Sequence, residues 1–192
     1  TRVHFWPDES YFDHASFGLA KLRQALRAKA VLLPGLKVSL RDHIHDETDE
    51  WCFQGGLAAY LDDSLAGLSR IPEDILEGSM ASDHEAVDWA LCWQPDGGEG
   101  PQESYVNLVP TPSGGTHVNG FRRAVNRVFT KYAEDNGLFS KLKFKISGED
   151  FREGLTAIVS VKVPEPQFKG QTKGELGNSE VTGIVSRAVG EV

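Results

Sequence analysis

The chain has 192 residues, of which 40% are hydrophobic and 25% are charged, and its formal net charge is -8. This composition is ordinary for a soluble globular protein of one large or two small domains. The sequence contains no run of about 18 uncharged apolar residues and no signal-peptide pattern. It therefore excludes a membrane-spanning helix and predicts a cytoplasmic protein.

The two cysteines, Cys52 and Cys92, are far apart in the sequence and do not form a CxxC motif. This spacing provides neither a disulfide framework nor a zinc site. We expect both cysteines to be core or strand residues.

The charges are unevenly distributed along the chain. Residues 41–50 hold five acids and two histidines, whereas residues 121–145 hold seven Lys or Arg against two acids. A locally basic segment can contact nucleic acid even when the whole chain is acidic.

In the first part of the chain, residues 3–5 alternate as a short strand that ends at Pro7. Because such a strand needs a partner and nothing precedes it, we expect the chain to be an internal piece of a larger protein. An amphipathic helix is predicted from an N-cap at Ser16 to a stop at Pro34. A hairpin and a second helix follow, with strands at 36–42 and 50–53 and the helix at 57–68.

In the second part, strands at 86–93 and 104–110 are separated by a Gly-rich turn and are predicted to pair as a hairpin. A long helix follows Gly115, and the β-branched residues 155–163 form the strongest predicted strand. A last helix is predicted over 178–189. The fold class expected from this order is α+β, a two-layer sheet with helices on one side.

The segment 163–181 joins the strongest predicted strand to the last helix. It does not match the Walker A phosphate loop. Because Pro164 and Pro166 cannot donate to a β-ladder, we expect the segment to stay out of a sheet and to project Gln171 and Lys173. From these residues alone, a solvated surface loop is the stronger interpretation.

Two other groups of polar residues are weaker candidates. His43 and His45 lie among acids, but no third ligand stands at a fixed spacing, so we expect a charged hairpin tip and no metal. His117 is interpreted as a residue of a helix start rather than as an acid or base, because no nucleophile motif accompanies it.

The long helix carries a basic face of Arg122, Arg123 and Arg127. Such a face can follow a phosphate backbone, or it can simply be solvated. The residues alone leave these two interpretations even.

Three blocks together resemble a known family, namely "RVHFWPD", "GGTHVNGFRRAV" and "EDFREGLTAIVSVKVPEPQFKGQTKGELGNSEV". They are similar to the B subunits of the bacterial type IIA DNA topoisomerases, and residues 5–42 resemble the topoisomerase IV branch more than the gyrase branch. The resemblance implies that residues 1–55 are the C-terminal part of a GHKL-type ATPase domain. Residues 56–192 would be the transducer domain, a fold similar to domain 2 of ribosomal protein S5.

The resemblance also implies roles for individual residues. Gln171 and Lys173 would contact the γ-phosphate of ATP, with Lys173 as the catalytic residue, and Thr1 would help to hold the adenine ring. Arg122 would face the DNA that passes between two protomers. Arg123 and Arg127 receive no role.

ATP and Mg²⁺ are the cofactors implied for the complete subunit. This fragment lacks counterparts of the family's general-base glutamate, magnesium-binding asparagine and glycine-rich lid, so we expect it to be inactive and to bind no cofactor alone. The implied partners are the topoisomerase IV A subunit, a second B subunit that dimerises with ATP, and double-stranded DNA, in chromosome segregation. The alternatives are a gyrase B subunit and a standalone S5-like nucleic-acid-binding module.

Overall fold

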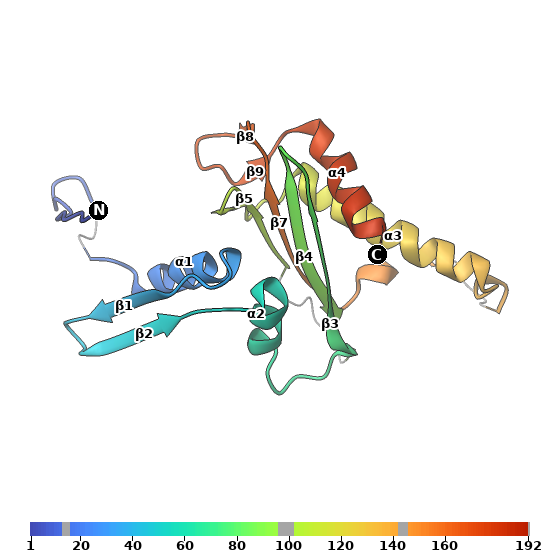
Figure 1. Ribbon diagram of the computed structural model, residues 1–192, viewed down its shortest axis with the longest axis horizontal. Coiled ribbons are helices and arrows are strands. Elements are labelled where there is room, and N and C mark those ends of the chain that lie inside the picture. Colours follow the sequence, from blue (N-terminus) through green and yellow to red (C-terminus); the bar gives the residue numbers. More distant parts are fainter. Residues whose placement is uncertain (13–15, 96–101, 142–145, 192) are drawn as a thin grey trace. The chain divides into compact units, whose positions relative to one another are not determined.

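The computed structural model describes residues 1–12, 16–95, 102–141 and 146–191. The chain divides into two compact units, Thr1–Gln54 and Gly55–Val192. Figure 1 shows the elements of each unit, which are described separately below.

The first unit consists of one helix and one β-hairpin. Helix α1 (Leu19–Leu32) packs against the antiparallel strands β1 (Val38–Asp42) and β2 (Glu47–Trp51). Arg23 of α1 holds β2 through ion pairs with Glu47 at 2.5 Å and Asp49 at 2.7 Å. The predicted hairpin is confirmed, although β2 begins three residues and ends two residues earlier than expected.

Three local expectations for this unit are wrong. Residues 3–5 form no strand in the described chain, because no neighbouring strand supplies ladder hydrogen bonds to them. The helix N-cap is Gly18 rather than Ser16, and it makes no side-chain cap bond. Cys52 follows β2 and is exposed, whereas Cys92 is buried within a strand as expected.

The second unit is built on a five-stranded sheet with the order β3-β4-β7-β5-β6. All neighbours are antiparallel except β5 and β7, which are parallel. The strands are β3 (Ile71–Ala81), β4 (Ala86–Trp93), β5 (Gln102–Val106), β6 (Val109–Pro110) and β7 (Leu155–Lys162).

The central strand β7 explains why the predicted hairpin of 86–93 with 104–110 is wrong. Residues 155–161 are all buried, so this apolar, β-branched strand needs covering on both faces and a partner on both edges. It lies between β4 and β5 and pairs with both. Most of the turn expected between those two strands, residues 96–101, lies outside the described residues.

Two helices cover one face of this sheet. Helix α3 (Thr116–Asp135) and helix α4 (Ser179–Gly190) pack against each other. One core cluster holds Trp89 of β4 and Val159 of β7 together with apolar residues of both helices, including Phe121. Figure 1 shows α3 and α4 side by side next to the sheet.

The short helix α2 (Gly56–Ser64) contacts β3, β4 and β7. Ala90 and Ile158 are buried but alternate with the residues of the core cluster, so they point to the opposite face, where α2 packs. The α+β class is therefore confirmed, and the expectation of helices on one side holds for α3 and α4 but not for α2.

Three small elements complete the unit. Two short 3-10 helices, η1 (Phe139–Lys141) and η2 (Asp150–Arg152), follow α3, and a two-stranded hairpin of β8 (Phe168–Lys169) and β9 (Glu175–Leu176) precedes α4. None of the helices in the described chain combines the length and the apolar character that a membrane crossing requires.

Candidate functional site

The segment that holds Gln171 and Lys173 is the tip of the β8–β9 hairpin. The expectation that this segment stays out of a β-ladder is wrong for residues 168–169 and 175–176, because both prolines precede these strands and leave the strand N–H groups free to pair. Gln171 and Lys173 are both exposed at the tip. The structure therefore presents them on a short hairpin rather than on an irregular loop.

The two lysines of this hairpin differ in their partners. Lys169 lies opposite Glu175 in the ladder, and its Nζ is 2.5 Å from the Glu175 carboxylate. Lys173 has a left-handed backbone, with φ of 55°, and its Nζ lies 5.9 Å from the centre of the Phe168 ring. No ion pair of Lys173 is recorded in the described part of the chain, so its charge is open to an anion.

Asn178 fastens the base of the hairpin to the start of α4. Its side-chain oxygen accepts a hydrogen bond from the Gln167 N–H at 2.6 Å, and its amide nitrogen donates to the Glu165 carbonyl at 3.2 Å. Gly177 N–H also donates to the Gln167 carbonyl at 2.7 Å. Asn178 is 7% exposed, so these bonds are made largely away from water.

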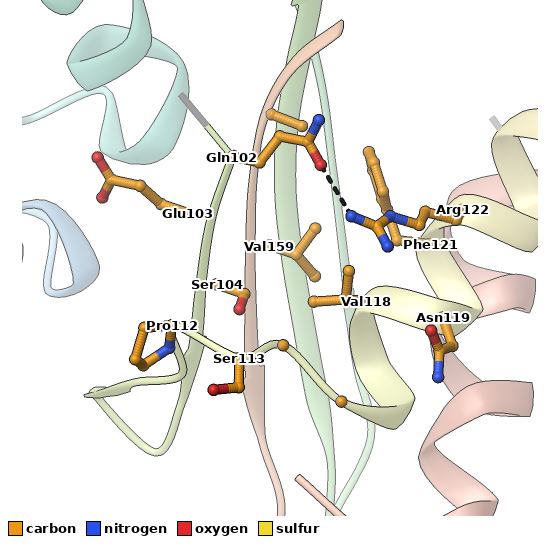
Figure 2. Close-up of a pocket in the computed structure, with 13 residues that line it drawn as sticks. Gln102, Glu103, Ser104, Pro112, Ser113, Val118, Asn119, Phe121, Arg122 and Val159 are labelled. Atoms are coloured by element: carbon orange, nitrogen blue, oxygen red, sulfur yellow. Dashed lines mark hydrogen bonds between the residues drawn. The ribbon is translucent and has the colours of Figure 1, made fainter. Parts of the chain in front are cut away.

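Arg122 lies near the start of α3 and is exposed. Its Nη2 donates to Oε1 of Gln102 on β5 at 3.3 Å, as Figure 2 shows. Glu103, the next residue, points away from Arg122 and accepts hydrogen bonds from Tyr60 at 2.8 Å and from Tyr105 at 2.5 Å. The Arg122 charge is therefore not neutralised by this carboxylate.

Arg122 borders two hollows. The first has a volume of about 200 Å³ and lies between β5, β7 and the first turns of α3. The second is an open depression of about 630 Å³ that also contains Gln102, Arg152 and three acids, which are Glu149, Asp150 and Glu153. Acids in this depression reduce the local positive potential, so Arg122 does not belong to a broad basic patch.

The other two arginines of the basic helical face, Arg123 and Arg127, differ in their hydrogen-bond partners. Arg127 donates from Nη2 to the Ser186 carbonyl at 2.8 Å and so joins α3 to α4. Arg123 is exposed, with no partner recorded in the described residues.

His117 lies in the first turn of α3 and is fully buried. Its Nε2 is 3.1 Å from Oγ1 of Thr111, and burial lowers the pKa of its imidazole to about 4. A histidine that stays neutral and out of solvent is a poor acid or base for a substrate. This environment agrees with its interpretation as a helix-start residue.

The histidines of the first unit lie in a different environment. His45 Nδ1 lies 2.5 Å from the Asp42 carboxylate, whose hydrogen bond raises the pKa of His45. Within the described residues, no group of three or more His, Cys, Asp or Glu side chains has the arrangement of a metal site. Thr1 is exposed and belongs to this same unit.

Residues 56–192, most of the chain, match the protein-family model described as DNA gyrase B. The chain belongs to this family. The resemblance to the B subunits of bacterial type IIA topoisomerases is thereby confirmed.

Curated relatives of this family cover nearly the whole chain. The B subunit of DNA topoisomerase 4 from Pseudomonas aeruginosa is 46% identical over 98% of this chain, and that from Escherichia coli K12 is 44% identical over the same share. The B subunit of DNA gyrase from Cytophaga aurantiaca is 40% identical over 100% of this chain. The chain spans 30% of the length of the two topoisomerase 4 relatives and 41% of the gyrase relative.

Solved structures of the family have the same fold. The 43K ATPase domain of Thermus thermophilus gyrase B, in complex with an aminocoumarin, has a TM-score of 0.78 and 32% identity. It matches 96% of this chain, which covers 50% of that chain. The topoisomerase IV ATP-binding domain of Francisella tularensis has a TM-score of 0.78 and 36% identity, with 97% of this chain and 50% of that chain covered.

The sequence singles out Lys173 and Arg122 as candidates. It does not identify Asn178, which holds the base of the hairpin that carries Lys173, or Gln102, which accepts a hydrogen bond from Arg122. The sequence places Asn178 only at the start of the last predicted helix, and it gives no sign of the role of Gln102. The signal for Asn178 is weak, since its bonds reach back 11 and 13 residues to backbone groups.

Proposed function

We propose that this chain is the energy-transducing region of a type II DNA topoisomerase B subunit, of the topoisomerase IV type. Residues 1–55 are then the C-terminal part of the GHKL ATPase domain, and residues 56–192 are the S5-like transducer. Two findings support this division. The family match begins at residue 56, and the boundary of the two compact units falls between Gln54 and Gly55.

In this proposal Gln171 and Lys173 hold the γ-phosphate of ATP, and Thr1 helps to hold its adenine ring. The exposed tip supports the assignment, because it offers one amide and one ammonium that lacks a carboxylate partner among the described residues. ATP, bound with Mg²⁺ in the complete subunit, supplies the phosphoryl group. Lys173 and Gln171 stabilise negative charge on its terminal oxygens, as preorganised donors do in phosphoryl transfer.

The fragment alone does not hydrolyse ATP in this proposal, because the general base and the magnesium ligand belong to the rest of the ATPase domain. Lys173 is therefore one part of a site that two domains complete. The similarity to ATPase and ATP-binding domains twice the length of this chain supports this view.

Arg122 faces double-stranded DNA in the proposal, and the working enzyme contains two B subunits and the A subunit in the cytoplasm. An exposed guanidinium whose one hydrogen bond to the described residues, to Gln102, is long at 3.3 Å supports the DNA contact. Topoisomerase 4 relatives are 40–46% identical to this chain and gyrase relatives 40–42%, so the difference in identity that favours the topoisomerase IV branch over the gyrase alternative is small. A standalone S5-like module is disfavoured, since the relatives align with residues of both units.

The observation that carries the proposal is the Lys173 ammonium at the hairpin tip, which has no carboxylate partner in the described chain. Its test is Lys173→Ala in the complete subunit, assembled with its A subunit. A charge-assisted hydrogen bond contributes about 1.5 to 3 kcal/mol, so ATP turnover should fall by about 10- to 150-fold. Lys169→Ala is the matched control, because Glu175 already neutralises that lysine on the same hairpin.

Turnover of the Lys169→Ala variant should stay within about twofold of the parent value, as for other surface substitutions. If Lys173→Ala also kept the parent turnover, the γ-phosphate contact and the transducer assignment would both be wrong.

A further inference from the structure

The β8–β9 hairpin is bonded to the segment that begins α3. Ser113 N–H donates to the Gly174 carbonyl at 2.9 Å, and Leu176 N–H donates to the Gly114 carbonyl at 3.1 Å. Gly115 and Leu176 also form an isolated parallel β-bridge. Residues 113–115, which we name the strut, therefore run alongside the second strand of the hairpin.

Gly115 allows this contact because it has no side chain. A β-carbon at Gly115 would lie 2.4 Å from both N and O of Leu176, closer than real β-carbons approach other atoms. Its φ of 133° is also a backbone conformation that favours glycine. The strut and the hairpin are consequently in direct backbone contact at Gly115. No flexible side chain lies between them that could move aside to make room for an added β-carbon.

The hydrogen bonds between the strut and the hairpin lie close in sequence to Lys173, the proposed nucleotide contact. Gly174, whose carbonyl the strut holds, directly follows Lys173 and is buried, and Leu176 is 0% exposed. On the other strand, the hairpin is held through Gln167 and Asn178. The strut thus fixes the strand that leaves the tip, so the position of Lys173 depends on the backbone of residues 113–115.

We propose that Gly115 is a positioning residue for Lys173 and that the strut transmits the position of the hairpin tip to α3. This rests on the proposed function, in which Lys173 contacts the γ-phosphate. Helix α3 begins at Thr116, and Arg122 lies about two turns along it. A shift of the hairpin therefore moves the base of the helix that carries Arg122.

The test is Gly115→Ala in the complete subunit with its A subunit. The added β-carbon must push the hairpin away from the strut, and a misplacement of about 1 Å at a reacting group lowers rates by about 100-fold. We expect ATP turnover to fall by about that factor while the affinity for ADP, which lacks the γ-phosphate, stays unchanged. A lesion that unfolds the whole subunit would weaken ADP binding as well.

Gly67→Ala is the matched control. Gly67 has a left-handed φ of 82°, but a β-carbon there would meet no atom within 4 Å. Gly67→Ala therefore places alanine at a positive φ, as Gly115→Ala does, but without a steric clash. ATP turnover of Gly67→Ala should stay within about twofold of the parent value. Equal turnover by the two variants would overturn the inference.

Lys173→Ala, measured in parallel, separates failure of the inference from failure of the proposed function. If Lys173→Ala keeps the parent turnover, the proposed function fails. If Lys173→Ala loses turnover but Gly115→Ala does not, the γ-phosphate contact stands and the positioning role of Gly115 is wrong.

Hydrogen exchange of the parent subunit provides a test that needs no variant to fold. Replacing ADP by a non-hydrolysable ATP analogue should slow amide exchange at Leu176 and at Ser113 together, since both N–H groups bridge the strut and the hairpin. Slower exchange in residues 168–176 with no change at Ser113 would contradict transmission through the strut.

Discussion

Lys169 and Lys173 show how two identical side chains on one hairpin acquire different chemistry. The ladder places Lys169 opposite Glu175, whereas the turn places Lys173 at the tip with a left-handed backbone. A non-glycine residue in this region costs about 1 kcal/mol or more and persists where its surroundings impose it. The hairpin thus keeps one cation paired and one available.

The sequence could not distinguish these lysines by pattern alone. Residue chemistry predicted a projecting segment with a cation, and the family resemblance supplied the γ-phosphate. The ion pair between Lys169 and Glu175 depends on the hairpin register, which the two prolines led us to exclude. The proposed roles of Gln171, Lys173 and Thr1 remain predictions.

His117 should make the stability of the chain depend on pH. Its folded pKa of about 4 lies below the ordinary 6.5, so between these values the unfolded chain binds a proton that the folded chain does not. The stabilisation is complete above about pH 6.5 and is lost as the pH falls toward about 4, by on the order of 3 kcal/mol. Urea denaturation at several pH values measures this loss.

His117→Asn should remove most of this pH dependence, because asparagine does not titrate. His84→Asn is the control, since His84 is exposed in the turn between β3 and β4 and should leave the dependence intact. Identical pH profiles for the parent and His117→Asn would refute the role of His117.

At the scale of elements, the sheet shows what periodicity predicts and what it does not. The apolar run of β7 identified the strongest strand, and alternation identified β4. Pairing was wrong, because local spacing favours neighbours in sequence whereas burial places β7 between β4 and β5. Strand β3 was missed, since it is an edge strand with mostly exposed or half-buried residues and no clear apolar alternation.

Asn178 should contribute to stability as a junction between the hairpin and α4. Asn178→Ala removes bonds to Gln167 and Glu165 from a largely buried position, so the free energy of unfolding should fall by about 1 to 3 kcal/mol. Chemical denaturation of the chain measures the difference.

Asn136→Ala is a suitable comparison, because Asn136 donates to the Tyr132 carbonyl at the exposed end of α3. Its loss should change the free energy of unfolding by about 0.5 kcal/mol or less. A cost for Asn178→Ala no larger than this would show that the junction is unimportant.

At the scale of the whole molecule, the proposal connects a nucleotide contact to a DNA contact through α3 and the strut. A differential contact of about 3 kcal/mol shifts a two-state equilibrium by about 150-fold. Loss of the γ-phosphate would therefore release the transducer, as in other switches that a phosphate holds in place.

Arg122→Gln should weaken DNA binding by the complete enzyme and reduce DNA-stimulated ATP turnover. Removing one phosphate contact lowers the dependence of log affinity on log salt by about one unit. Binding to duplex DNA at a series of salt concentrations measures the slope. Arg123→Gln is the control, because Arg123 is also exposed but does not line the depression beside Arg122, and this variant should keep the parent slope. An unchanged slope for Arg122→Gln would assign Arg122 to a solvated helix face.

The central claim is that Lys173 recognises the γ-phosphate, and the ratio of two affinities tests it most directly. A non-hydrolysable ATP analogue and ADP are each titrated into the complete subunit carrying Lys173→Ala or Lys169→Ala. The preference for the ATP analogue over ADP should fall by about 10- to 150-fold in Lys173→Ala and persist in Lys169→Ala. An equal preference in both variants would contradict the account.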